Sequence, residues 1–348
     1  MDQLAFKFPD YTILILDQLR QADWFAHCLQ VDTEDDIYNP ALYLYHNHIN
    51  GIAYHLIFDL NIYQYVLSAY KKTDKKQIHR DAIALMVFCK FTDILVDPTF
   101  AIYEKINYQN DFSDEILEDL ILFRQLDNAD MDQLAQFALG HTDLIALPGP
   151  PETDKGQLRH ELTKYHRLKK WDTLYLIVLK ITCLCHCDSA PTHQKVQKLL
   201  DWCHQYFLFS LAATSFAISL FAASSSLMKY KPAAPQQDRK KALMNMTWDL
   251  FYVDKFFEKW VAKDGAVESI YATNDGPLKE VLYRAISLQL QPDASQFADD
   301  LPDKLIKVIA AISERMVDEK GRNLRKGMDF KTYRDALISE LEIVLHVR

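Results

Sequence analysis

Four acidic residues stand where the sequence could gather them into one site. Asp59 and Asp275 each follow a short apolar run of strand length, whereas Glu104 and Asp249 lie in segments with a helical spacing of apolar residues. The carboxyl ends of the strands in an open parallel sheet meet at one edge, and binding sites form at that edge. Four carboxylates gathered there would repel one another unless cations lay between them. Mg²⁺ or Mn²⁺, which prefer oxygen ligands, suit such a site.

The chemistry that such a site supports is hydrolysis of a phosphodiester bond. Two divalent ions can activate a water molecule and stabilise the leaving oxygen. Each carboxylate taken alone is better explained as a surface charge or a helix cap. The prediction therefore depends on the ordered set and not on any one residue.

Short strands and the helices between them must position these residues. Apolar runs predict strands at residues 55–58, 93–96 and 269–272, and most of the remaining chain shows helical periodicity. We therefore expect an α/β fold in which a parallel sheet is flanked by helices.

The order of these elements resembles the PIN-domain family. That family has a strand followed by Asp-x-Asn, a strand followed by Pro-x5-Glu on a helix, an Asp on a helix, and a strand followed by Thr-x-Asp. The matching segments are residues 58–61, 96–104, 247–250 and 271–278. The resemblance maps the family's acidic positions onto Asp59, Glu104, Asp249 and Asp275, and its supporting polar positions onto Asn61 and Thr273.

The resemblance implies a metal-dependent endonuclease that uses Mg²⁺ or Mn²⁺ and attacks with water, not with a 2′-hydroxyl of the substrate. RNA is the expected nucleic acid. A role as a toxin or an antiviral effector, and a regulatory protein partner, are expectations from the family alone. The third acidic position has two candidates, Asp249 and Asp254. We favour Asp249, because positions five apart on a helix point about 140° apart and only one is expected to face inward.

The expected domain organisation follows from the same resemblance. A PIN-like core in two parts would be interrupted by a large all-helical insertion and extended by helices at both ends. The predicted segments are an N-terminal extension at 1–49, core parts at 50–111 and 238–300, the insertion at 112–237, and C-terminal helices at 301–348.

The most basic stretch, residues 154–170, predicts a track for backbone phosphates. Its charged residues are Lys155, Arg159, Lys164, Arg167, Lys169 and Lys170. A solvated helix face explains the same pattern equally well.

Two other functions remain open at this point. The pair Arg159 and His166 is similar to the Arg-x4-6-His element of HEPN ribonucleases, which are helical and need no metal. The spacing recurs at Arg20 and His27, so the pattern is not specific. The chain could also be an inactive PIN-like scaffold that serves as a binding subunit.

Composition argues against several other nucleotide-binding classes. The chain has eight glycines among 348 residues and no Gly-rich phosphate-binding loop of the Rossmann, P-loop or kinase type. The net charge of -9 argues against a broad basic DNA-binding face. It says little about a nuclease, because carboxylates around metal ions make such an enzyme acidic.

Residues 206–228 carry no charge and reach the length of a membrane span. A span there would separate Asp59 and Glu104 from Asp249 and Asp275. The prediction of a single site therefore requires a buried helix at this place. With no secretory signal at the N-terminus, we expect a cytoplasmic protein without a membrane partner.

The cysteines offer a further possible metal site. Cys183, Cys185 and Cys187 lie close together in the sequence, and Cys203 and His204 follow at a distance. No Cys-x-x-Cys pair is present, and alternate residues on a helix face different ways. Buried structural thiols are the simpler interpretation.

Overall fold

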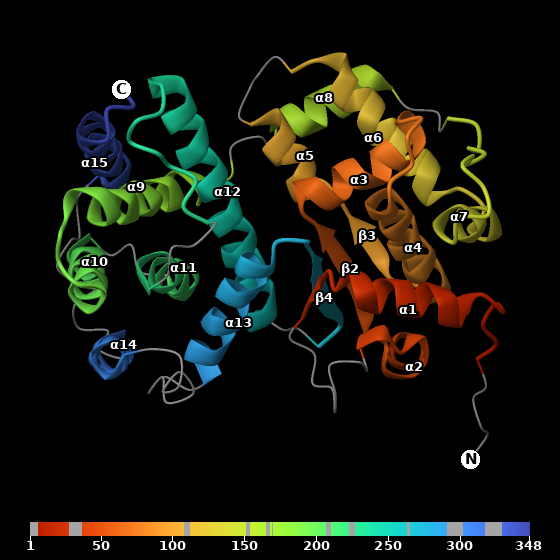
Figure 1. Cartoon of the computed structure of the whole chain (residues 1–348), viewed down its shortest axis with the longest axis horizontal. Helices are drawn as coiled ribbons and strands as arrows, with labels where there is room; N and C mark the ends of the chain where they lie inside the picture. Colours follow the sequence, from red (N-terminus) through yellow and green to blue (C-terminus); the bar gives the residue numbers. More distant parts are fainter. Residues whose placement is uncertain are drawn as a thin grey trace. The chain divides into compact units, whose positions relative to one another are not determined.

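The computed structural model describes residues 6–27, 37–107, 112–150, 154–164, 168, 170–206, 210–222, 227–262, 265–290, 302–316 and 329–348. The chain forms two compact units (Figure 1). The first consists of residues 1–167 and 259–275, and the second of residues 168–258 and 276–348.

The first unit contains a mixed sheet of four strands in the order β1-β4-β2-β3. The strands are β1 (Phe25–Ala26), β2 (Ala53–Phe58), β3 (Leu95–Asp97) and β4 (Val267–Ala272). β2 pairs in parallel with both β3 and β4, while β1 runs antiparallel to β4. The predicted α/β fold is confirmed, and the three predicted strands are the three parallel ones. The expected all-parallel sheet is wrong at its edge, where β1 adds an antiparallel strand.

The central strand β2 explains why helices cover the sheet. Tyr54, Leu56, Ile57 and Phe58 are all buried, so its side chains are enclosed on both faces at its carboxyl end. A continuous apolar run of this kind is typical of a strand in a parallel sheet with helices on both sides. Helices α2, α3 and α5 contact β2, and α4 contacts β3.

The helices of the first unit pack mainly around α4, whose middle turns are buried from Ala82 to Cys89. α1, α3 and α7 all pack against it. The helices of this unit are α1 (Thr12–Ala22), α2 (Pro40–Asn50), α3 (Leu60–Lys71), α4 (Gln77–Phe91), α5 (Thr99–Ile106), α6 (Asp114–Asp127), α7 (Met131–Ala138) and α8 (Lys155–Lys164).

The segment 112–237, predicted as one helical insertion, is divided between the two units. Its first part, with α6, α7 and α8, packs on α3, α4 and α5 in the first unit. The Phe123 ring of α6 lies edge-on to Phe58 of β2 and against Tyr63 of α3. These helices therefore belong to the first unit, where α6 and α7 pack on the helices around the sheet and α8 packs on α6.

The N-terminal extension, predicted as helical over 1–49, also belongs to this unit and supplies β1. Helix α1 ends at Ala22, and Asp23 adopts a left-handed conformation with φ 49°. The chain then extends into β1. A two-residue strand shows no alternation of polar and apolar residues, so the helical periodicity on either side hid it.

A buried carboxylate joins three helices of the first unit. Asp119 of α6 is 2% exposed and accepts hydrogen bonds from Lys71 of α3 and Lys105 of α5. A buried charge is tolerated when it is paired and hydrogen-bonded. Asp119 therefore holds α3, α5 and α6 together by charge as well as by apolar contact.

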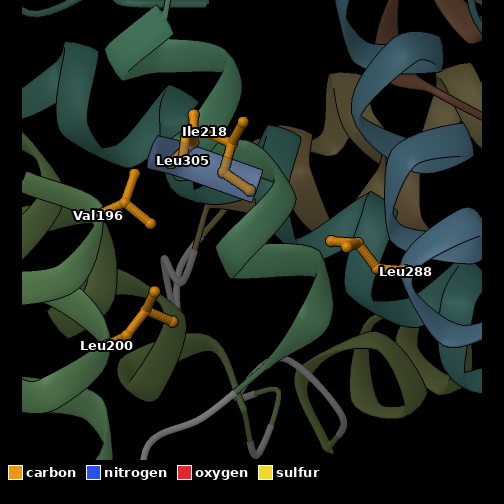
Figure 2. Packing of buried hydrophobic residues seen from close by; sticks show 5 residues of the cluster. All are labelled: Val196, Leu200, Ile218, Leu288 and Leu305. Atoms are coloured by element: carbon orange, nitrogen blue, oxygen red, sulfur yellow. The ribbon is translucent and has the colours of Figure 1, made fainter. Parts of the chain in front are cut away.

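The described part of the second unit is helical. It contains α9 (Trp171–Cys187), α10 (Thr192–Tyr206), α11 (Leu211–Ala222), most of α12 (Gln236–Val261), α13 (Gly276–Leu290), α14 (Asp303–Met316) and α15 (Phe330–Val344). Figure 2 shows part of its core, where side chains from α10, α11, α13 and α14 meet. These are Val196, Leu200, Ile218, Leu288 and Leu305.

The uncharged stretch 206–228 does not form one long helix. α10 ends at Tyr206, and α11 is 12 residues long with Phe216, Ala217 and Ile218 fully or nearly fully buried. The prediction of a buried helix is therefore confirmed for residues 212–220 of α11. None of the helices in the described ranges has the length and apolar character needed to cross a bilayer.

We expect Asp119→Asn to lower the free energy of unfolding by about 1–3 kcal/mol, because two lysines lose their shared buried partner. The value lies below that of a fully buried pair because Lys71 and Lys105 are 43% and 24% exposed. Chemical denaturation measures the change. The matched control is Glu118→Gln, whose exposed ion pair with Lys155 should be worth less than about 1 kcal/mol. Equal stability of the two variants would contradict a structural role for Asp119.

Candidate functional site

The carboxyl ends of β2 and β4 lie side by side. Phe58 and Ala272 are paired in register, and the Asp59 N–H donates to the Ala272 carbonyl at 3.1 Å. On the other side of β4, the Thr273 N–H donates to the Trp24 carbonyl at 2.9 Å. The backbone pairing therefore continues one residue beyond each strand and holds Asp59 and Thr273 at the same edge of the sheet.

Asp59 directly follows β2 and caps the next helix, α3. Its Oδ1 accepts a hydrogen bond from the Ile62 N–H at 2.7 Å, and the residue is 5% exposed. An aspartate at this position satisfies one of the unpaired donors of the first helical turn. The cap fixes the orientation of the carboxylate at the sheet edge.

The Thr-x-Asp segment after β4 forms a tight turn. Thr273 is fully buried, and its Oγ1 accepts a hydrogen bond from the Asp275 N–H at 3.1 Å. The amide of Asn274 donates to the hydroxyl of Tyr65 on α3 at 3.2 Å. These two bonds hold Asp275, which is half-buried, immediately before α13. Thr273 therefore stabilises this turn. Its predicted role in supporting the acidic residues stays a prediction.

Glu104 and Asn61 lie on the helices that leave the same edge. Glu104 is half-buried on α5, which follows β3 and contacts both α3 and β2. Asn61 is exposed in the first turn of α3, two residues after Asp59.

Asp97, a further carboxylate at this edge, was not among the predicted site residues. It ends β3, is paired with Ile57, and accepts a hydrogen bond from the Thr99 N–H at 3.0 Å. Lys259 lies 3.8 Å from its other oxygen. The criterion that selected Asp59, an aspartate directly after an apolar run, would also have selected Asp97.

The two candidates for the third acidic position, Asp249 and Asp254, both belong to the second unit. Asp249 is ion-paired with Lys229 at 2.5 Å. Asp254 accepts from the Ser210 hydroxyl at 3.1 Å and lies 3.6 Å from Lys170. Both side chains are largely enclosed, at 15% and 7% exposed, so which of the two faces the candidate site stays a prediction. α12 is buried on almost all sides over residues 246–254. The direction in which a residue points from this helix therefore does not distinguish Asp249 from Asp254.

The donors at the sheet edge can be compared with what Mg²⁺ or Mn²⁺ needs. Within the described ranges, no group of three or more His, Cys, Asp or Glu side chains is arranged to hold an ion. Mg²⁺ usually keeps several of its waters and is bound by one or two carboxylates together with substrate phosphates. Carboxylates at the end of β2 and just after β4 therefore fit an ion that is bound jointly with a substrate.

The basic stretch 154–170 is divided between the units after residue 167. Lys155 lies 3.3 Å from Glu118. Lys170 contacts Glu258 as well as Asp254. The Lys164 side chain, Arg167 and Lys169 lie outside what the structure describes. Lys155 and Lys170 therefore face carboxylates, so binding of phosphates there would require an exchange of partners.

Arg159 has a clear structural role. Its guanidinium donates to the Phe112 carbonyl at 2.6 Å and to Asp114 at 2.5 Å, and it stacks over the Phe112 ring. These contacts fasten α8 to the start of α6. His166, its predicted HEPN-like partner, lies outside the described residues. In the second pair with this spacing, Arg20 bonds Asp17, and His27 is buried.

The cysteines of α9 and α10 are free thiols. Burial raises the pKa of Cys183 to about 12 and that of Cys185 to about 11. Cys203 is buried as well, and its pKa is raised to about 12 for the same reason. Thiols of this kind stay protonated at neutral pH. The interpretation as buried thiols holds for Cys183 and Cys203, whereas Cys185 is half-buried and Cys187 is exposed.

We expect Asp59→Ala to lower the free energy of unfolding by about 1–2 kcal/mol, because α3 loses its cap. Asp59→Asn should change it by less than about 0.5 kcal/mol, since an amide oxygen can accept the same hydrogen bond. Denaturant titration of both variants tests this. Asp130→Ala, which removes the side-chain cap of α7, gives a reference value for a cap elsewhere. If Asn destabilises as much as Ala, the negative charge and not the cap holds this turn.

We compared the chain with protein-family models, curated proteins and solved structures, and none of them matches it.

Proposed function

We propose that the chain is a PIN-like, metal-dependent endonuclease that hydrolyses phosphodiester bonds of RNA. The observation that carries this proposal is the parallel pairing of β2 with β4. It brings Asp59 and the Thr273-x-Asp275 turn to the same edge of the sheet, although they lie far apart in the sequence. Ligands of open α/β sheets bind at this edge.

The donor chemistry supports a divalent ion. Asp59 and Asp275 supply carboxylate oxygens, and Glu104 is on the helix that follows the neighbouring strand β3. Mg²⁺ or Mn²⁺, when bound, would lower the pKa of a coordinated water and stabilise the charge on the leaving oxygen. Asp59, Glu104 and Asp275 are the residues that we propose to hold the ion.

The chain's own contribution is to keep these carboxylates in place before the substrate arrives. The cap of α3 orients Asp59, and the Thr273 hydroxyl orients the backbone at Asp275. A site whose groups are already oriented loses less free energy to reorganisation during the reaction. Asn61, exposed beside Asp59, is proposed to support the same oxygens by hydrogen bonding.

We expect the wild-type protein to cleave labelled single-stranded RNA with Mn²⁺ and to lose this activity in EDTA. Asp59→Asn should reduce cleavage at least about a hundredfold, because the variant keeps the helix cap but removes the charge that holds the ion. Asp275→Asn and Glu104→Gln should also reduce it. Glu118→Gln, an exposed carboxylate on α6, is the matched control and should cleave as the wild type does.

The same assay separates the other functions. Cleavage that survives EDTA and Asp59→Asn but stops with His166→Ala would replace this proposal with a HEPN-like mechanism. No cleavage of RNA or single-stranded DNA by a folded protein would favour a binding subunit. Asp249→Asn and Asp254→Asn, measured in parallel, decide which α12 carboxylate, if either, contributes.

A further inference from the structure

A cavity of about 730 Å³ lies beside the carboxyl end of β3 in the first unit. This volume falls within the range of small-molecule sites, roughly 300–1,000 Å³. Val96, Pro98 and Thr99 form the side nearest the sheet, and α5, α6 and α8 form the rest. Because Asp97 ends β3 opposite Ile57 of β2, the cavity begins at the same sheet edge as Asp59.

The part of the lining that comes from α5 and α6 is largely apolar. Ile102 and Tyr103 of α5 and Leu120 and Phe123 of α6 are all at most 8% exposed. The Phe123 ring is itself supported by Phe58, the residue before Asp59. A flat, mostly apolar ligand would therefore meet a firm surface that is continuous with the candidate site.

The polar part of the lining contains side chains that form no hydrogen bond or ion pair among the described residues. These are Arg124 and Asp127, one helical turn apart on α6, and His160 on α8. By contrast, Gln157 and Glu161 of α8 bond to each other at 3.2 Å. Unpaired groups of opposite charge on one cavity wall can bind a ligand that carries both donors and acceptors.

Asp127 is the least solvated of these groups. It is half-buried at the last position of α6, where the helix dipole disfavours negative charge. Burial raises the pKa of its carboxyl group, and the nearby Lys90 ammonium partly offsets this. Lys90 itself donates to the backbone carbonyl of Asp127 and not to the carboxylate. A ligand with two donors would satisfy a carboxylate that its own surroundings leave poorly solvated.

The charges of the lining disfavour simple ions. Asp127 and Glu161 oppose an anion, and Arg124 opposes a cation. A neutral heteroaromatic ring with donors and acceptors on its edge fits best. Among the four RNA bases, guanine alone offers two adjacent donors on its Watson–Crick edge, N1–H and N2–H, for one carboxylate. Its O6 and N7 acceptors suit an arginine.

We propose that this cavity binds an unpaired guanine base of a single-stranded RNA, with Asp127 accepting from N1–H and N2–H and Arg124 donating to O6 and N7. The inference rests on the proposed nuclease function and names the substrate feature that the enzyme would select. An adenine in the same place presents an acceptor, N1, to the Asp127 carboxylate. It should bind about tenfold or more weakly, because a buried acceptor then faces another acceptor.

The test is fluorescence anisotropy of two labelled RNA pentamers, UUGUU and UUAUU, with the full-length protein in EDTA. EDTA prevents metal-dependent cleavage and removes any contribution of an ion. We expect UUGUU to bind about tenfold or more tightly than UUAUU. Asp127→Asn, which replaces one acceptor with a donor, should abolish this preference. Glu118→Gln, which changes an exposed carboxylate on α6 outside the cavity lining, should retain it.

Arg124→Gln is the second variant, because Arg124 is exposed and its replacement should leave the fold intact. It should also reduce the preference for UUGUU. Equal binding of the two RNAs, no measurable binding of either, or a preference that survives both Asp127→Asn and Arg124→Gln would overturn the proposal. If only the nuclease proposal is wrong, the protein will still bind UUGUU selectively in EDTA but will not cut RNA with Mn²⁺.

Discussion

The parallel pairing of β2 with β4 is the interaction on which the rest of the first unit depends. These strands come from distant parts of the chain, and closing a long loop costs conformational entropy that rises slowly with its length. The pairing spans six residue pairs from Ala53 to Phe58 and is extended by the bond from Asp59 to Ala272. Helices α3 and α5 then cover β2, and Phe123 of α6 closes over Phe58. If the register slipped by one residue, buried side chains would turn to the wrong face, and Asp59 would no longer lie opposite Thr273.

Much of this arrangement could be predicted from local patterns. The apolar runs before Asp59 and Asp275 predicted strands that the structure extends by two residues each, at Ala53 and Val267. The aspartate after a strand also predicted a position at the sheet edge, and the cap of α3 explains why that position suits aspartate. That these residues hold an ion stays a prediction. The strand β1 could not be predicted, because two residues show no period and its pairing with β4 is set by distant contacts.

The remaining differences arise because a sequence pattern shows an element but not its neighbours. Helical periodicity correctly predicted helices within residues 112–164, yet it could not show that α6 and α7 pack on α3, α4 and α5. Counting basic residues over 154–170 could not show that Arg159 fastens α8 to α6. The choice between Asp249 and Asp254 stays a prediction for a related reason, since a helix buried on most of its circumference has no single inward face. In each case the missing information was the set of partners, which only the tertiary structure supplies.

The chain crosses between its two units at residues 167, 258 and 275, so neither unit is a continuous stretch of sequence. This has a consequence for biosynthesis. During translation β2 is made early, but its neighbour β4 is synthesised only after most of the second unit. The nascent polypeptide therefore holds Asp59 without Thr273 and Asp275 beside it until ribosomes have passed residue 275. A product of premature termination within residues 168–258 would lack β4 and would carry an incomplete sheet edge, so the proposed ion ligands would come together only late in synthesis.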